Sequence, residues 1–288
     1  MRESSNPIMR GVVRDNKKEA GGYASFGQGL AGAGQASMAT GQQQYTDQYT
    51  QGYVPQADTR PMTIDDVVTK TAMTLGVLIV VAAGAYFAIS QQASLAAPLM
   101  AVGAIGGLIL VLIASFGRKQ DNPAIVLTYS AFEGLFVGSI SYVFGNWVIS
   151  DDTSAGALIG QAVLGTLGVF VGMLVVYKVG AIRVTPRFTR MLMAGMVGVL
   201  VLMLGNLVLG LFGVDSGLRS GGPIAIIFSL VCIALAAFSF LLDFDQADEL
   251  IRAGAPSKAA WGVALGLTVT LVWLYVEILR LLSYFNSD

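Results

Sequence analysis

Seven long apolar stretches between Thr71 and Phe285 constrain the fold of this chain more than any other feature. Each is about 20 residues long, the length that a helix needs to cross a hydrocarbon core of about 30 Å. A soluble chain of 288 residues cannot bury seven such segments, and only 12% of the residues are charged. The sequence therefore predicts an all-α membrane protein with seven transmembrane helices at residues 71–89, 97–116, 123–145, 157–177, 188–213, 221–242 and 259–285.

The basic residues are distributed unevenly over the predicted loops. Of the 17 Lys and Arg residues, all but Arg219 and Arg280 lie in the N-terminal segment or in and beside the loops after the second, fourth and sixth stretches. The loop after the third stretch is acidic, with Asp151 and Asp152. Because loops rich in Lys and Arg stay in the cytoplasm, we expect a cytoplasmic N-terminus and an outer C-terminus in the cell (plasma or inner) membrane.

Residues 1–62 differ in composition from the rest of the chain. They are rich in Gly, Gln, Ser, Ala and Tyr and contain little to bury, so we expect a disordered cytoplasmic tail. Thr63, followed three residues later by Asp66, predicts a capped helix start. The seven-helix transmembrane domain is therefore expected over residues 63–288.

Several classes of chemistry are excluded by what the sequence lacks. The chain has no histidine, which excludes His-ligated zinc or haem and Ser-His-Asp catalysis. Its one cysteine, Cys232, lies inside the sixth stretch and is expected to be an apolar packing residue. No phosphate-binding Walker A motif is present, so ATP-driven transport is not expected. We predict that the chain is not an enzyme and has no cofactor and no nucleic-acid partner.

Ionisable residues within the predicted spans are candidates for function, because they are costly in a bilayer. Glu133 lies about 15 Å into the third stretch, near the midplane, and Glu277 about 27 Å into the seventh. Glu133 must be protonated, paired or facing a wet cavity. Glu277 has an ordinary alternative, because Arg280 is placed to form an i,i+3 ion pair with it at the interface.

A second group of charges lies at the predicted cytoplasmic boundary. Asp243 ends the sixth stretch and is followed by Asp245, Asp248 and Glu249, which a solvated loop would also explain. Arg118 ends the second stretch at the same boundary, so that Asp243 and Arg118 could form a static pair or a latch.

Glycines spaced four residues apart indicate close packing of helices. Such small-residue spacing allows helix backbones to approach in lipid. It occurs at Gly134 and Gly138, Gly168 and Gly172, and Gly262 and Gly266.

Three motifs resemble those of the Bax-inhibitor (transmembrane Bax-inhibitor-motif) family. They are Phe132–Leu135, Leu242–Gln246 and Leu274–Glu277. The likeness covers about residues 62–285, and the chain is similar to a bacterial branch of that family with a long N-terminal tail. It implies a bundle in which the seventh helix is central and surrounded by the other six, and a pH-sensitive calcium leak through the membrane.

The resemblance also implies roles for particular residues. Asp243 matches an aspartate at the end of the sixth helix, and Arg118, eleven residues before Tyr129, matches the arginine of a protonation-controlled latch. In the family a second aspartate, in the seventh helix, pairs with the first. At that position this chain has Thr270 in one alignment and Glu277 in another, so a sensor made of two carboxylates is not assured by the sequence.

The sequence therefore supports the hypothesis of a passive, pH-sensitive Ca²⁺ leak, gated at the cytoplasmic side. Glu133 and Asp243 are the candidate weak Ca²⁺ ligands, Asp243 and Arg118 the closing pair, and Asp245, Thr270 and Glu277 further candidates for the ion pathway. The alternative is a membrane scaffold that modulates another membrane complex, such as a protease or stress-response assembly, through its tail. An intramembrane aspartyl protease is a third reading, which the missing Gly-x-Gly-Asp motif disfavours.

Overall fold

Each predicted span is a helix in the structure. The computed structural model describes residues 60–147, 154–213 and 217–286, and within these ranges seven helices are long and apolar enough to cross a membrane. They are α2 (Ile64–Gln91), α3 (Ala96–Phe116), α4 (Pro123–Trp147), α5 (Ala155–Val179), α6 (Pro186–Leu211), α7 (Pro223–Arg252) and α8 (Ala260–Phe285), with the short 3-10 helices η1 (Ala93–Leu95) and η2 (Ser257–Ala259). The all-α, seven-span membrane fold is confirmed. The expected tail up to residue 59, Asp151 and Asp152 lie outside the described residues.

The start of α2 confirms the predicted cap. The backbone N–H of Asp66 donates to Thr63 Oγ1 at 3.3 Å, and the N–H of Thr63 donates to the Asp66 carboxylate at 3.0 Å. This reciprocal pair satisfies donors that a helix N-terminus otherwise leaves open. Arg60 adds two further bonds to the same carboxylate, at 2.8 and 2.6 Å. The helix therefore begins at Ile64, before the apolar run that starts at residue 71.

The predicted end of the sixth span at residue 242 is wrong. Helix α7 continues to Arg252, so that Asp243 lies within the helix and not at its boundary. Hydropathy falls after Leu242, but Ala247, Leu250 and Ile251 continue an apolar stripe that packs against the core. An amphipathic turn of this kind stays helical although its mean hydropathy is low.

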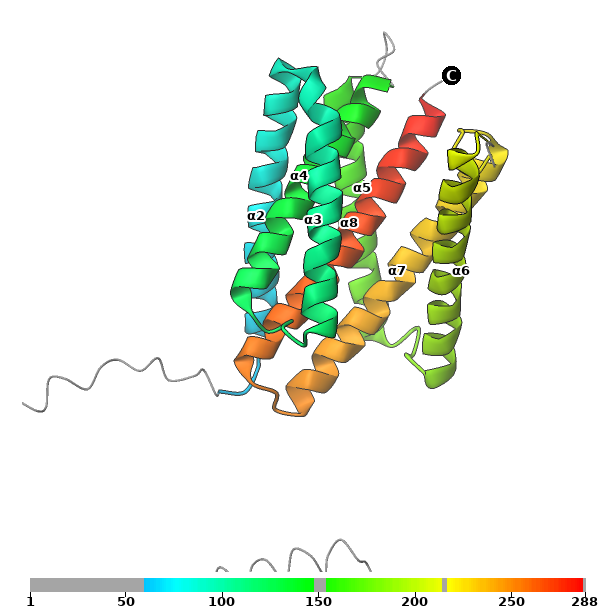
Figure 1. Cartoon of the computed structure of the whole chain (residues 1–288). Coiled ribbons are helices and arrows are strands. Elements are labelled where there is room, and N and C mark those ends of the chain that lie inside the picture. The colour runs from blue at the N-terminus through cyan, green and yellow to red at the C-terminus, as the bar shows by residue number, and fades with distance from the viewer. Residues whose placement is uncertain (1–59, 148–153, 214–216, 287–288) are drawn as a thin grey trace, which may run out of the picture. The chain divides into compact units, whose positions relative to one another are not determined.

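Helix α8 occupies the centre of the bundle, as predicted (Figure 1). Of its span, 72% is buried, against 6% for α6. It packs directly against α2, α4, α5 and α7, whereas α3 packs mainly on α4, and α6 on α7. Figure 1 shows α6 beside α7 at one edge of the bundle, away from α2, α3 and α4. The apolar residues that α6 exposes are those expected to face lipid.

Glycines bring α2 and α4 into backbone contact. A Cβ added to Gly134 would lie 2.7 Å from the carbonyl oxygen of Leu78, and one added to Gly138 would lie 2.3 Å from that of Ala82. The close packing predicted from these two glycines is thus confirmed. For Gly168 and Gly172 of α5, none of the described residues has an atom within 4 Å of an added Cβ, so their spacing does not mark a helix contact there.

One end of the bundle carries the loops that are rich in Lys and Arg, and we call it the basic end. It is held together by contacts among these loops. The segment before α2 pairs with the α7–α8 loop, where Met62 N donates to Ala255 O at 2.7 Å and Ser257 N donates to Arg60 O at 2.9 Å. The α3–α4 loop joins the same loop through an ion pair of 2.7 Å between Asp121 and Lys258. The starts of α2, α4 and α8 and the end of α7 therefore all lie at this end.

Candidate functional site

Asp243 of α7 faces the central helix and meets Thr270. The Thr270 hydroxyl donates a hydrogen bond of 2.8 Å to Asp243 Oδ2, and also one of 3.2 Å to the carbonyl oxygen of Gly266. Gly266 lies beside the same carboxylate, because a Cβ added there would be in ordinary van der Waals contact with Asp243 Oδ1, at 3.6 Å. Of the two positions between which the sequence could not decide, Thr270 is therefore the one that contacts Asp243. A neutral hydroxyl thus donates to the Asp243 carboxylate from the central helix.

Glu133 of α4 also has a hydroxyl partner. Tyr129, one turn earlier on α4, donates a hydrogen bond of 2.7 Å to Glu133 Oε1. The Tyr129 ring packs with Leu265 of α8 and with Ala114 of α3. The carboxylate lies against α3, since a Cβ on Gly107 would be 3.6 Å from Glu133 Oε2. Glu133 is half-buried and lines a cavity.

Glu133, Asp243 and Thr270 lie at similar depths in the bundle. Glu133 is ten residues after the start of α4, Thr270 is ten residues after the start of α8, and Asp243 is nine residues before the end of α7. At a rise of about 1.5 Å per residue, each is about 14–15 Å from the basic end. The two carboxylates are therefore placed near one level, beside neighbouring turns of α8.

Arg118 lies in the α3–α4 loop at the basic end, and no ion pair of the described residues joins it to Asp243. The residue is exposed, with φ of +52°, the one positive φ of a non-glycine residue in the described ranges. It lines a hollow of about 310 Å³ together with Gln246, which is one helical turn beyond Asp243. The predicted latch pair is not formed in this arrangement, and its role stays a prediction.

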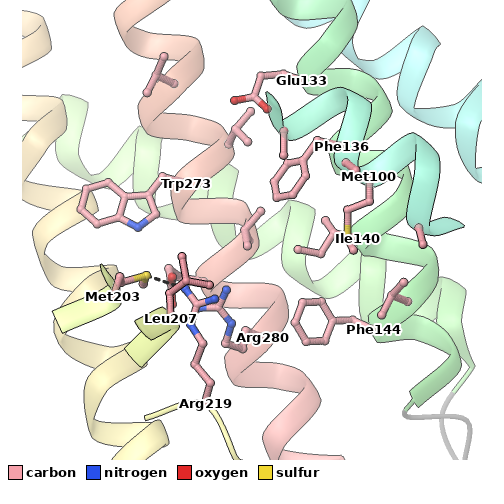
Figure 2. A pocket seen from close by; sticks show the side chains of 18 of the residues that line it. Met100, Glu133, Phe136, Ile140, Phe144, Met203, Leu207, Arg219, Trp273 and Arg280 are labelled. Carbon is pink, nitrogen blue, oxygen red and sulfur yellow. Dashed lines mark hydrogen bonds and ion pairs between the residues drawn. The ribbon is translucent and has the colours of Figure 1, made fainter. Parts of the chain in front are cut away.

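Glu277 and Arg280 form the predicted i,i+3 ion pair, but inside the bundle. Arg280 Nη1 donates to Glu277 Oε1 at 2.7 Å, and the side chains are 8% and 2% exposed. The pair is therefore buried in the bundle and not an exposed anchor, and it lines a cavity of about 970 Å³ between α3, α4, α6 and α8. Figure 2 shows Glu133 at one end of this cavity and Arg219 and Arg280 toward the other.

The remaining acidic residues lie on the last turns of α7. Asp248 pairs with Arg252 at 2.5 Å and accepts a hydrogen bond of 3.4 Å from Tyr177 of α5. Asp245 is two residues after Asp243 on α7, about 200° around the helix axis from it. The structure thus does not bring Asp245 to the Asp243–Thr270 contact.

Sequence reasoning missed three features of the site. Tyr129 is four residues before Glu133, the spacing at which helical side chains meet, so that its bond was open to prediction. Asp121 and Lys258 are far apart in the chain and carry no local signal of pairing. The hydrogen bond from Lys258 lowers the pKa of Asp121 below its ordinary value. From the sequence Arg219 stands out only as an exception to the charge asymmetry, and its place in the cavity depends on the packing of α6.

Comparisons with known proteins identify a family. The family described as Bax inhibitor 1 like matches residues 6–287, so that the match extends into the segment before residue 62. No protein of curated function matches the chain. Among the described residues there is no group of three or more His, Cys, Asp or Glu that could hold a metal ion.

Proposed function

The chain belongs to the Bax inhibitor 1-like family of multi-span membrane proteins, and on that premise we propose that it is a pH-sensitive passive leak for Ca²⁺. The family is linked to calcium leak. We place the chain in the cell membrane, with the basic end in the cytoplasm, as the positive-inside rule predicts.

The observation that carries the proposal is the Asp243–Thr270 contact on the central helix. An ionisable carboxylate between two packed helices changes its charge when the pH changes, and its hydrogen bond to Thr270 changes with it. The neutral carboxyl oxygen is a weaker acceptor than the carboxylate, so protonation weakens the bond from Thr270 and the α7–α8 contact differs between the two states. The buried pair is thus a chemical basis for a pH-dependent bundle.

Glu133 supports a cation pathway at the same level. Ca²⁺ is a hard ion that prefers several oxygen ligands, and the Glu133 and Asp243 carboxylates, with the hydroxyls of Tyr129 and Thr270, offer oxygen atoms about 14–15 Å from the basic end. So few groups would hold the ion weakly and partly hydrated, which suits passive flux. Thr270 in place of a second carboxylate makes Asp243 the single titrating group of the gate.

Arg118 is the proposed cytoplasmic latch. Ionised Asp243 would attract its guanidinium into the hollow beside Gln246, and protonation would release it. The left-handed backbone at Arg118 costs about 1–2 kcal/mol for a residue with a Cβ. Strain of this kind often marks a segment with a functional constraint, and a shift of the α3–α4 loop would relieve it.

The test is Ca²⁺ flux into proteoliposomes between about pH 5.5 and 8. We expect wild-type flux to vary with pH, Asp243→Asn to lose that variation, and Glu133→Gln to reduce flux at every pH. Asp245→Asn is the matched control, because it removes an equal charge from the same helix, about 200° around the helix axis from Asp243; it should keep the pH dependence.

Two results would refute the leak or its gate. Preserved pH dependence in Asp243→Asn would remove that residue from the gate. Flux no higher than in empty liposomes under every condition would refute the leak and favour the scaffold. Deletion of residues 1–59, which keeps Arg60 and its bonds to Asp66 and Ser257, then separates the two functions, because a leak survives the deletion and a scaffold that binds through its tail does not.

A further inference from the structure

The cavity between α3, α4, α6 and α8 has a charged end that the proposed leak does not use. That end lies at the C-terminal parts of α4, α6 and α8, opposite the basic end, and is formed by Glu277, Arg280 and Arg219. Figure 2 shows Arg219 and Arg280 close together there, with Trp273 on the wall between them and Glu133.

The charges at this end do not balance. Glu277 Oε1 accepts from Arg280, but Glu277 Oε2 is buried and has no hydrogen-bond partner among the residues that the structure describes. The Arg219 guanidinium donates to the thioether sulfur of Met203, a weak acceptor. Burial and the nearby charge of Arg280 lower the pKa of Arg219. Two guanidinium groups thus share one carboxylate, and the end of the cavity has an excess positive charge together with one open acceptor.

The rest of the cavity is apolar and meets the bilayer. Met100 of α3, Phe136 and Ile140 of α4 and Leu207 of α6 lie along its walls. Helix α3 packs mainly on α4 and α6 on α7, without substantial contact between α3 and α6. The cavity is therefore open toward lipid between these two helices. Its volume of about 970 Å³ is at the upper end of the range in which proteins hold small ligands.

We propose that this cavity binds one anionic phospholipid of the surrounding bilayer, with its phosphate on Arg219 and Arg280 and an acyl chain along the apolar wall. A phosphate supplies the negative charge that the two guanidinium groups lack. A headgroup hydroxyl, as in phosphatidylglycerol, supplies the donor that Glu277 Oε2 lacks. Phosphatidylcholine has neither a net charge nor a headgroup donor, so the site discriminates against it. The proposal does not depend on Ca²⁺ transport.

Trp273 provides a direct readout, because it lines the cavity. The other two tryptophans, Trp147 and Trp261, are replaced by Phe, and the protein is reconstituted with lipids whose chains carry bromine, a short-range quencher of tryptophan fluorescence. Competition between brominated and ordinary lipids gives the binding constant of phosphatidylglycerol relative to phosphatidylcholine at Trp273.

We expect a ratio of about five in the protein that retains Trp273, the factor that one arginine contributes toward an anionic lipid. Arg219→Gln should bring it to about one. Arg183→Gln is the matched control, since Arg183 is exposed in the α5–α6 loop at the basic end, and it should leave the ratio unchanged. A ratio near one before substitution, or one that Arg219→Gln does not alter, would overturn the proposal.

Native mass spectrometry of the full wild-type chain gives a second measurement that needs no tryptophan substitution. After purification from mixed vesicles of the two lipids, a retained phosphatidylglycerol that is lost in Arg219→Gln supports the site. Equal retention of both lipids, or of neither, contradicts it.

Discussion

The contact between α2 and α4 permits a sharp test of the bundle, by the change Gly138→Ala. The added Cβ would lie 2.3 Å from the carbonyl oxygen of Ala82 and 3.0 Å from the Cβ of Ala85. Favourable contacts between nonbonded heavy atoms need about 3.5 Å, so the two helices must separate locally by about 1 Å. Overpacking of this kind costs about 1–3 kcal/mol, and the obstructing atom belongs to the backbone, which cannot change rotamer.

Gly172→Ala is the matched control, because the same methyl group is added to a helical glycine that has no neighbour within 4 Å in the described part of the chain. Alanine is the better helix former by about 0.8–1.0 kcal/mol, so this variant should be as stable as the wild type or slightly more stable. In a domain of this size each kcal/mol shifts the melting temperature by about 2–4 °C.

The assay is thermal unfolding of each purified variant in one detergent, followed by the loss of monodisperse protein. We expect Gly138→Ala to melt several degrees below the wild type and Gly172→Ala not to. Equal melting temperatures for Gly138→Ala and the wild type would show that the backbone contact is absent or easily relaxed. An equal fall in melting temperature in both variants would show that alanine in these helices is destabilising by itself, and that the contact with Ala82 is not the cause.

Three further predictions concern ion pairs and caps. The pKa of Asp121 is lowered in its pair with Lys258, so the pair should stabilise the chain at pH values above 3.8, the ordinary pKa of aspartate, and should lose this effect as the pH falls through the folded-state pKa. The melting temperature of Asp121→Asn measured against pH checks this, and the effect is small because both partners are substantially exposed. Glu277→Ala should lower the free energy of unfolding by about 3–5 kcal/mol, because it leaves Arg280 buried and unpaired. Glu277→Leu combined with Arg280→Met should lower it much less, and denaturant unfolding measures both variants. Thr63→Ala should cost about 1 kcal/mol by removing the cap of α2, measured in the same way; no change in stability would mean that Arg60 alone secures that helix end.

The helices were predictable because a helix that crosses a bilayer needs an apolar segment of about 20 residues, and such segments are visible in the sequence. The end of α7 was not, because after Asp243 the helix is stabilised by tertiary packing of Leu250 and Ile251, which hydropathy cannot detect. Hydropathy places Asp243 at the boundary of its span, and a residue at the boundary is not expected at the same depth as Glu133. Once α7 is extended, Thr270 becomes its neighbour and Glu277 does not.

The limits of pattern reading are clearest for glycine and arginine. Gly138 and Gly172 have the same spacing from a preceding glycine, yet only the first meets another helix. Periodicity identifies a small face but not what lies against it. Arg219 and Arg280 were visible as the two exceptions to the charge asymmetry, but only the fold shows that they share a cavity.

The pairing of Arg60 and Met62 with the α7–α8 loop has a mechanical consequence. Two backbone hydrogen bonds of 2.7 and 2.9 Å connect the strand-like entry to α2 with Ala255 and Ser257. A pull on the chain before Arg60 therefore reaches the loop between α7 and α8 before it reaches the lipid-facing helices. The entry segment acts as a tether, and tension on it is borne by the turn from which the central helix begins.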